Sequence, residues 1–171
     1  YKRQLYPLAN AVVDRGRTWS YQEVNERANA LSILLVKRGL KSGDSVMVYC
    51  NQSVELVIAF FAVLKAGGCY IPVTADWPEK RIVHIYHDSQ AKIVLTSHAI
   101  KERSASIPES CMINLDTFLA SKHSLSPVPA ACEPCLEKAY MIYTSGSNGE
   151  PKGVIVGHSG IANLKYLYEN D

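Results

Sequence analysis

The residue types best suited to chemistry are concentrated in one short segment, 143–153, with the sequence Tyr-Thr-Ser-Gly-Ser-Asn-Gly-Glu-Pro-Lys-Gly. Its glycines, Gly146, Gly149 and Gly153, allow tight turns that aim several backbone N–H groups at one anion. Lys152 adds a positive charge, and charge-assisted hydrogen bonds contribute about 1.5–3 kcal/mol each. The sequence therefore predicts a phosphate-binding loop. Its side-chain donors are the hydroxyl groups of Thr144, Ser145 and Ser147 and the amide of Asn148.

The order of the residues distinguishes this loop from a Walker A loop. In Walker A, the lysine directly follows a glycine and precedes Ser or Thr. Here Lys152 follows Pro151, which stiffens the turn, and precedes Gly153. A surface turn without a ligand is the alternative interpretation, but this density of glycines, hydroxyls and charge after an apolar strand is hard to explain in that way.

The elements that must position the loop follow from the spacing of apolar residues. A capping box at 20–23 opens a helix that ends at Gly39. Ser53 is expected to cap a second helix, which ends at Gly67, and Pro78 opens a third. Strands are predicted over 45–50, 69–73, 92–96, 111–115, 139–144 and 154–156, with a fourth helix over 158–168.

Strands that alternate with helices predict an α/β fold with a largely parallel sheet flanked by helices. The strands are continuous apolar runs, which is typical of strands covered on both faces. The segment 120–138 contains three prolines and is expected to be a surface connection. The chain begins without Met and stops within a helical pattern, so we expect a fragment of a longer protein.

Composition excludes several functions. The net charge of +2 is too small to favour nucleic acid or an anionic membrane as a partner. No apolar run approaches the roughly 18 residues of a membrane span, and residues 1–4 are not followed by the apolar core of a signal peptide, so we expect a cytoplasmic protein.

The five cysteines do not predict a disulfide framework, because their number is odd and the chain does not resemble a secreted one. Cys50, Cys69 and Cys111 lie in apolar runs and are expected in the core. Cys132 and Cys135 have zinc-like spacing but no second pair, so no metal site is predicted.

The segment 143–153 resembles the phosphate loop of the adenylate-forming superfamily: acyl-CoA synthetases, luciferases and the adenylation domains of nonribosomal peptide synthetases. Segments 19–25, 64–73, 76–82 and 88–92 resemble further motifs of this family in the same order. Segment 64–73, Leu-Lys-Ala-Gly-Gly-Cys-Tyr-Ile-Pro-Val, is most similar to amino-acid-activating domains. The chain thus looks like the N-terminal portion of the large subdomain of such an enzyme.

The resemblance implies ATP-dependent activation of a small carboxylic acid, with an amino acid favoured, as an acyl-adenylate with release of pyrophosphate. ATP and Mg²⁺ are the implied cofactors, and the acyl group would pass to the phosphopantetheine thiol of a carrier-protein domain. Lys152 is the implied catalytic residue. The implied phosphate-contacting set is Thr144, Ser145, Gly146, Ser147, Asn148, Gly149 and Lys152.

Some residues depart from the family pattern or fall outside the site. Asn148 stands where Thr is usual, and Thr74 where an acid is common. His158 matches a family position, for which we expect a structural role. His84 and Asp88 lie four residues apart and are interpreted as a solvated helix face.

The family builds its adenine, ribose, metal and acid sites from sequence that follows this loop. Residues 1–171 are therefore expected to be a partial N-terminal subdomain that holds only the phosphate part of the site and is inactive alone, with the C-terminal remainder as a required partner. Alternatives are an acyl-CoA synthetase-type ligase, a carboxylic-acid-reductase-type adenylation domain, or a non-catalytic relative acting as a scaffold. The intact loop argues against the last.

Overall fold

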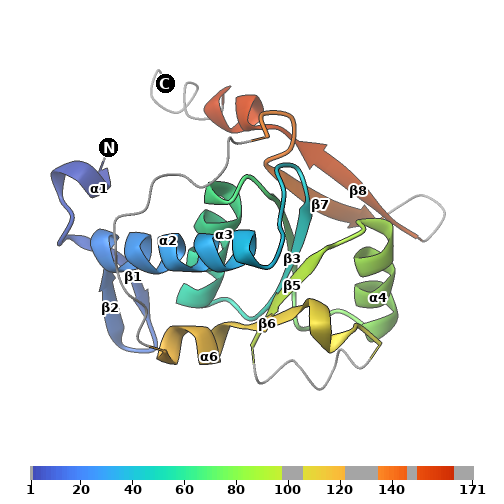
Figure 1. The fold of residues 1–171 in the computed structure, drawn as a ribbon, viewed down its shortest axis with the longest axis horizontal. Coiled ribbons are helices and arrows are strands. Elements are labelled where there is room, and N and C mark those ends of the chain that lie inside the picture. The colour runs from blue at the N-terminus through green and yellow to red at the C-terminus, as the bar shows by residue number, and fades with distance from the viewer. Residues whose placement is uncertain (1, 98–105, 122–134, 146–149, 164–171) are drawn as a thin grey trace.

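The computed structural model describes residues 2–97, 106–121, 135–145 and 150–163. Two sheets and their flanking helices make up this part of the chain (Figure 1). The elements are α1 (Lys2–Leu5), β1 (Asn10–Asp14), β2 (Arg17–Ser20), α2 (Tyr21–Lys37), β3 (Ser45–Tyr49), α3 (Val54–Lys65), β4 (Cys69–Val73), α4 (Glu79–Asp88), β5 (Ile93–Thr96), the 3₁₀ helix η2 (Glu109–Cys111), β6 (Met112–Asn114), α6 (Leu115–Ala120), β7 (Tyr140–Ser145) and β8 (Pro151–Val156). Residues 158–163 are also helical.

The main sheet has six strands in the order β6-β5-β3-β4-β7-β8. Its neighbouring pairs from β6 to β7 are all parallel, and only β8 runs antiparallel, to β7. The prediction of an α/β fold with a largely parallel sheet flanked by helices is therefore confirmed.

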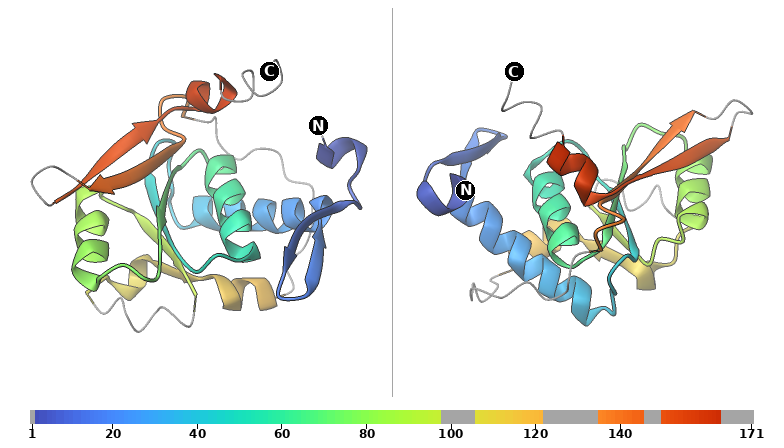
Figure 2. Two further views of the ribbon diagram at one scale, coloured as in Figure 1. Left: turned by 180° about the vertical axis from the view of Figure 1, so that it is seen from behind. Right: turned by 90° about the horizontal axis from the view of Figure 1, so that it is seen from above.

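Helices cover both faces of the sheet, and residues alternate between two apolar cores (Figure 2). Val46 and Val48 of β3 join the core formed with α2 and α3. Met47 and Tyr49, the residues between and after them, join the core formed with α4. This alternation follows from the period of two in a strand, and it explains why β3 is apolar throughout.

Three elements differ from the predictions. The hairpin of β1 and β2 was not predicted; it turns at Arg15 and Gly16, both with positive φ. The strand predicted over 111–115 is shorter, because Leu115 begins α6 and Asn114 accepts a capping hydrogen bond from Thr117 N at 2.8 Å. The strand predicted over 154–156 begins earlier, at Pro151. The segment predicted as surface connection lies mostly outside the described residues, which resume at Cys135.

The two predicted helix caps had different outcomes. The capping box of α2 is confirmed: Ser20 Oγ accepts from Glu23 N, and Glu23 Oε2 accepts from Ser20 N at 2.9 Å. The side-chain cap predicted at Ser53 is wrong, because the Ser53 hydroxyl donates to Asn51 O instead. The N-terminus of α3 is met by Asp14, whose Oδ2 accepts from Val54 N at 3.3 Å. An acid from the hairpin thus replaces the local cap.

Two of the three cysteines expected in the core are buried there, and Cys111 is the exception. Cys50 and Cys69 are buried, whereas Cys111 is half-buried at the end of η2, where its Sγ accepts from Tyr86 Oη at 3.7 Å. Cys135 is half-buried, and Cys132 lies outside the described residues. Within the described ranges, no three His, Cys, Asp or Glu residues group into a potential metal site, and no helix has the length and apolarity to cross a membrane.

We expect Asp14→Ala to lower the free energy of unfolding by about 1 kcal/mol, because Val54 N loses its acceptor and the positive end of α3 loses a carboxylate. Ser53→Ala is the matched control and should change it by less than about 0.5 kcal/mol. Urea denaturation of the two variants measures the difference. A larger loss for Ser53→Ala than for Asp14→Ala would show that the local residue caps the helix.

Candidate functional site

The predicted phosphate loop is the connection of a β-hairpin. Strands β7 and β8 pair Tyr143 with Gly153, Thr144 with Lys152, and Ser145 with Pro151. Directly opposed residues of an antiparallel pair share a face, with Cβ atoms about 4.5–5.5 Å apart. The side chains of Thr144 and Lys152 therefore lie side by side, and both residues are exposed. A hydroxyl donor and an ammonium group are thus presented on one face of the hairpin, next to the loop.

Of the other predicted phosphate contacts, Ser145 alone lies within the described residues. Ser145 is exposed at the last strand position before the connection. Gly146, Ser147, Asn148 and Gly149 lie outside the described residues. The loop leaves the sheet at the carboxyl end of β7, which is parallel to β4. Ligands of open α/β sheets bind outside the carboxyl ends of the strands, so the loop lies at the edge where a ligand is expected.

Tyr143, the first residue of the predicted loop, is a buried anchor. Its side chain is 3% exposed, and its hydroxyl donates to Asp88 Oδ2 at 2.6 Å. Burial, together with the neighbouring Asp88 carboxylate, raises the pKa of Tyr143 above its usual range. The phenol therefore keeps its proton and remains a hydrogen-bond donor at neutral pH.

The interpretation of His84 and Asp88 as a solvated helix face is incomplete: Asp88 is exposed and His84 half-buried, but each also has a partner on the hairpin. Both residues contact the hairpin, through Pro151 O, 3.4 Å from His84 Nε2, and through Tyr143 Oη. These contacts join positions 67 and 55 residues apart, so local spacing on the helix could not predict them. His158 begins the last described helix, is half-buried, and its backbone N–H donates to Leu136 O.

Gly153 has a role different from the predicted one. It lies within β8, not at a turn, and a Cβ there would lie 2.7 Å from Met141 Sδ and 3.1 Å from Tyr143 Cζ. The missing side chain thus makes room for the Tyr143 ring and Met141 on the same face of the hairpin. Gly153 allows close packing beneath the loop. The tight turn that the sequence predicted at this position is not formed, because Gly153 lies within strand β8.

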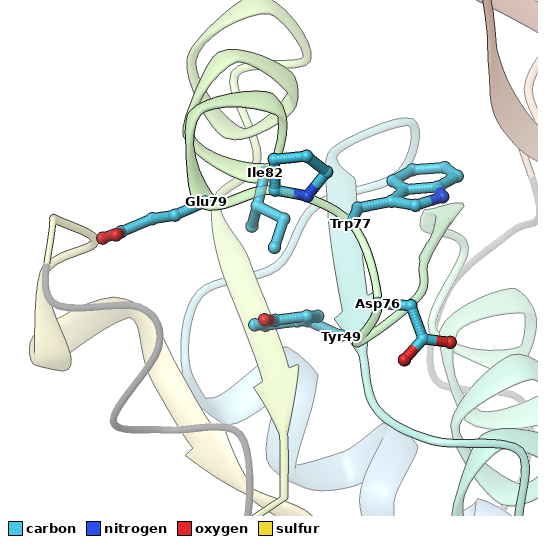
Figure 3. A pocket seen from close by; sticks show the side chains of 6 residues that line it. Tyr49, Asp76, Trp77, Glu79 and Ile82 are labelled. Carbon is cyan, nitrogen blue, oxygen red and sulfur yellow. The ribbon is translucent and has the colours of Figure 1, made fainter.

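Sequence analysis missed a cavity of about 290 Å³ at the carboxyl ends of β3 and β4. Figure 3 shows the Tyr49 ring and Ile82 on its walls, with the carboxylates of Asp76 and Glu79 directed away on opposite sides. After β3 the chain crosses to β4 through α3, and after β4 it crosses to β5, on the other side of β3, through α4. This reversal puts a topological switch point, where α/β sheets bind ligands, between β3 and β5, and Tyr49 at the end of β3 lines the cavity.

The wall of this cavity is linked to the hairpin by Arg81. Its guanidinium lies 4.0 Å from the centre of the Trp77 ring, which lines the cavity. Its Nη2 donates to the backbone oxygen of Tyr143 at 3.4 Å. The only signal in the sequence was the motif-like segment 76–82, which carries both residues but does not indicate what they contact.

Comparison with known proteins places these features in a family. The family profile described as AMP-binding enzyme matches residues 2–170. Tyrocidine synthase 3 of Brevibacillus parabrevis is 41% identical over 160 residues, which is 92% of this chain and 2% of that protein. Tyrocidine synthase 1 of the same organism is 38% identical over 98% of this chain and 15% of its own length. The chain therefore spans a small part of the curated relatives that it matches.

Solved structures give the same result. The nonribosomal peptide synthetase FmoA3, bound to alpha-methyl-L-serine-AMP, superposes with a TM-score of 0.85 at 31% identity over 99% of this chain and 19% of its own. The Klebsiella oxytoca NpsA N-terminal subdomain, in complex with 3-hydroxyanthranilyl-AMSN, gives a TM-score of 0.76 at 27% identity over 95% of this chain and 40% of its own.

We expect Gly153→Ala to lower the free energy of unfolding by about 1–3 kcal/mol, because the new methyl group overlaps Met141 and the Tyr143 ring. Adding Met141→Ala should recover part of this loss by removing the 2.7 Å contact. Val154→Ala, one position away and half exposed, is the control and should have a smaller effect. Urea denaturation measures all three, and full stability of Gly153→Ala would refute the close packing.

Proposed function

Because this chain belongs to the AMP-binding enzyme family, we propose that it forms the ATP-phosphate-binding part of an enzyme that activates an amino acid as an aminoacyl-adenylate, with release of pyrophosphate. Residues 1–171 would be a partial N-terminal subdomain of that enzyme, with 120–138 as a surface connection and 143–153 as the phosphate loop. The observation that carries the proposal is the pairing of Thr144 with Lys152 at the carboxyl edge of the sheet.

The chemistry required of this part of the enzyme is binding and charge neutralisation. Attack of a carboxylate on the α-phosphate of ATP places additional negative charge on the phosphate oxygens, and the pyrophosphate leaving group carries charge away. The Lys152 ammonium would pair with those oxygens, and the Thr144 and Ser145 hydroxyls would donate hydrogen bonds to them. Gly146, Ser147, Asn148 and Gly149 would complete the set with backbone and side-chain donors.

Lys152 has the geometry that this role needs. It is exposed on the hairpin, and neither ion pair among the described residues includes it, so its charge is available to a ligand. Mg²⁺, when bound with ATP, would share the phosphate charge. Among the described residues, no three His, Cys, Asp or Glu side chains group together so that they could hold a metal ion. We therefore assign no magnesium ligand to them.

An amino acid is the favoured substrate because the relatives include three tyrocidine synthases and FmoA3 is a nonribosomal peptide synthetase. FmoA3, at 31% identity, is bound to an amino-acid adenylate. The activated acid would be transferred to the phosphopantetheine thiol of a carrier domain. An aryl acid is the second candidate, since the NpsA N-terminal subdomain is bound to a hydroxyanthranilyl compound at 27% identity.

We expect Lys152→Ala to reduce carboxylate-dependent ATP–pyrophosphate exchange by about 10- to 100-fold in the natural protein that contains this chain, the range of one charge-assisted hydrogen bond. Lys152→Arg should retain more activity, since it keeps the charge. Lys41→Ala is the matched control: it also removes an exposed lysine, but from the amino-terminal edge of β3, opposite the loop. Equal activity of Lys152→Ala and Lys41→Ala would contradict the loop assignment.

We also expect residues 1–171 alone to show no carboxylate-dependent exchange, because this chain covers only 19% of FmoA3 and 15% of tyrocidine synthase 1. The adenine, ribose and acid contacts would come from other parts of the enzyme. The assay compares the isolated 171 residues with the natural protein under the same conditions. Turnover by the isolated chain would mean that these residues hold a complete site.

A further inference from the structure

The hairpin that carries the loop has little support from the sheet. Strand β7 pairs with β4 at Tyr140, opposite Tyr70, at the end of β7 farthest from the loop, where Tyr70 N also donates to Ala139 O. Strand β8 pairs only with β7 within the described residues. The hairpin therefore projects beyond its parallel neighbours, and Figure 1 shows its loop end lying over α4. Near the loop, the hairpin is held by the Tyr143 ring, which is buried in the core with Tyr49 and Ile71, and by polar contacts with α4.

Helix α4 presents three polar side chains to the hairpin. Arg81, His84 and Asp88 have the spacing i, i+3 and i+7, which places them on one face of the helix. Ile82 and Ile85, each one position further, are buried against the sheet. Helix α4 thus packs into the core through its apolar face and contacts the hairpin through the adjacent polar face.

The three contacts reach both strands at the root of the loop. Tyr143 on β7 is held twice, through its hydroxyl by Asp88 at 2.6 Å and through its backbone oxygen by Arg81 at 3.4 Å. Pro151 O on β8 lies 3.4 Å from His84 Nε2. Tyr143 directly precedes Thr144, and Pro151 directly precedes Lys152, so each side of the loop is held next to one of the residues proposed to bind phosphate.

Arg81 is itself held in place. Its guanidinium stacks on Trp77, and its Nε is buried without a hydrogen-bond partner among the described residues. Such burial costs free energy and is compensated here only by the stacking and by the contact with Tyr143 O. The geometry fixes the direction of the Nη2 donor toward β7.

We propose that Asp88 and Arg81 are positioning residues for the phosphate loop, and that the Tyr143–Asp88 hydrogen bond is the principal tie between α4 and the hairpin. The inference rests on the proposed phosphate-binding function of the loop. A ligand binds with a smaller entropic cost when the donors are already held near their final positions, and the contacts with α4 hold both strands at the root of the loop.

The test compares Tyr143→Phe, which removes only the hydroxyl, with Asp88→Ala and with the double variant. Amide hydrogen exchange over 150–156 in the natural protein, without nucleotide, should be about tenfold faster in each single variant, the size of one hydrogen bond to a charged group. The double variant should be no faster than either single variant. Strands β3 and β5 should exchange as in the wild type.

Kinetics separate positioning from general stability. In carboxylate-dependent ATP–pyrophosphate exchange, both single variants should raise the KM for ATP about tenfold and leave the KM for the carboxylic acid unchanged. Tyr86→Phe is the matched control, because Tyr86 also lies on α4 and donates its hydroxyl, but to Cys111 Sγ and away from the hairpin. It should leave both constants and the hairpin exchange unchanged.

The outcomes that overturn the proposal are distinct from those that overturn the function. Unchanged hairpin exchange in Tyr143→Phe, additive effects in the double variant, or equal changes in both KM values would each refute the positioning role. A wild-type protein without carboxylate-dependent exchange would refute the proposed function, whereas the hydrogen-exchange comparison would still decide whether Asp88 holds the hairpin.

Discussion

The attachment of the β7–β8 hairpin to the sheet governs the architecture around the loop. Tyr140 opposite Tyr70 pairs the hairpin with β4 at its base, and the Tyr143 ring is buried in the core on the α4 side of the sheet. Helix α4 lies beneath the hairpin and is held by Ile82 and Ile85 in the core on that face of the sheet. The parallel sheet therefore positions a helix, the helix positions the hairpin, and the hairpin presents Thr144 and Lys152.

Local patterns were sufficient to predict most of the elements and the location of the loop. The capping box at Ser20, the apolar runs of β3 and β4, and the residues of segment 143–153 are each specified by residues within a few positions of one another. The resemblance to the adenylate-forming superfamily rested on segments of the same kind, and the AMP-binding enzyme profile matches residues 2–170. These features are determined by short-range physics, which a sequence displays directly.

The remainder depends on contacts between distant residues. Asp14 meets the amide of Val54 across 40 positions, and this contact replaces the local cap expected from Ser53. Tyr143 meets Asp88 across 55 positions, so that a polar helix face expected only to meet solvent also contacts the hairpin. Gly153 was interpreted as a turn residue because segment 143–153 is rich in glycine. The β7–β8 register instead places it opposite Tyr143, where it has a packing role. Register and long-range pairing are properties of the folded chain.

Strand β8 has a second consequence as the outermost strand of the sheet. Within the described part of the chain, no strand pairs with its outer side, and Val154 and Ile155 are about half exposed. An apolar edge of this kind is a template to which another strand can add, either from elsewhere in a longer chain or from a second copy. Preparations of these 171 residues by themselves would thus be prone to edge-to-edge association, and Lys152, the one charged side chain within β8, would be the main local deterrent.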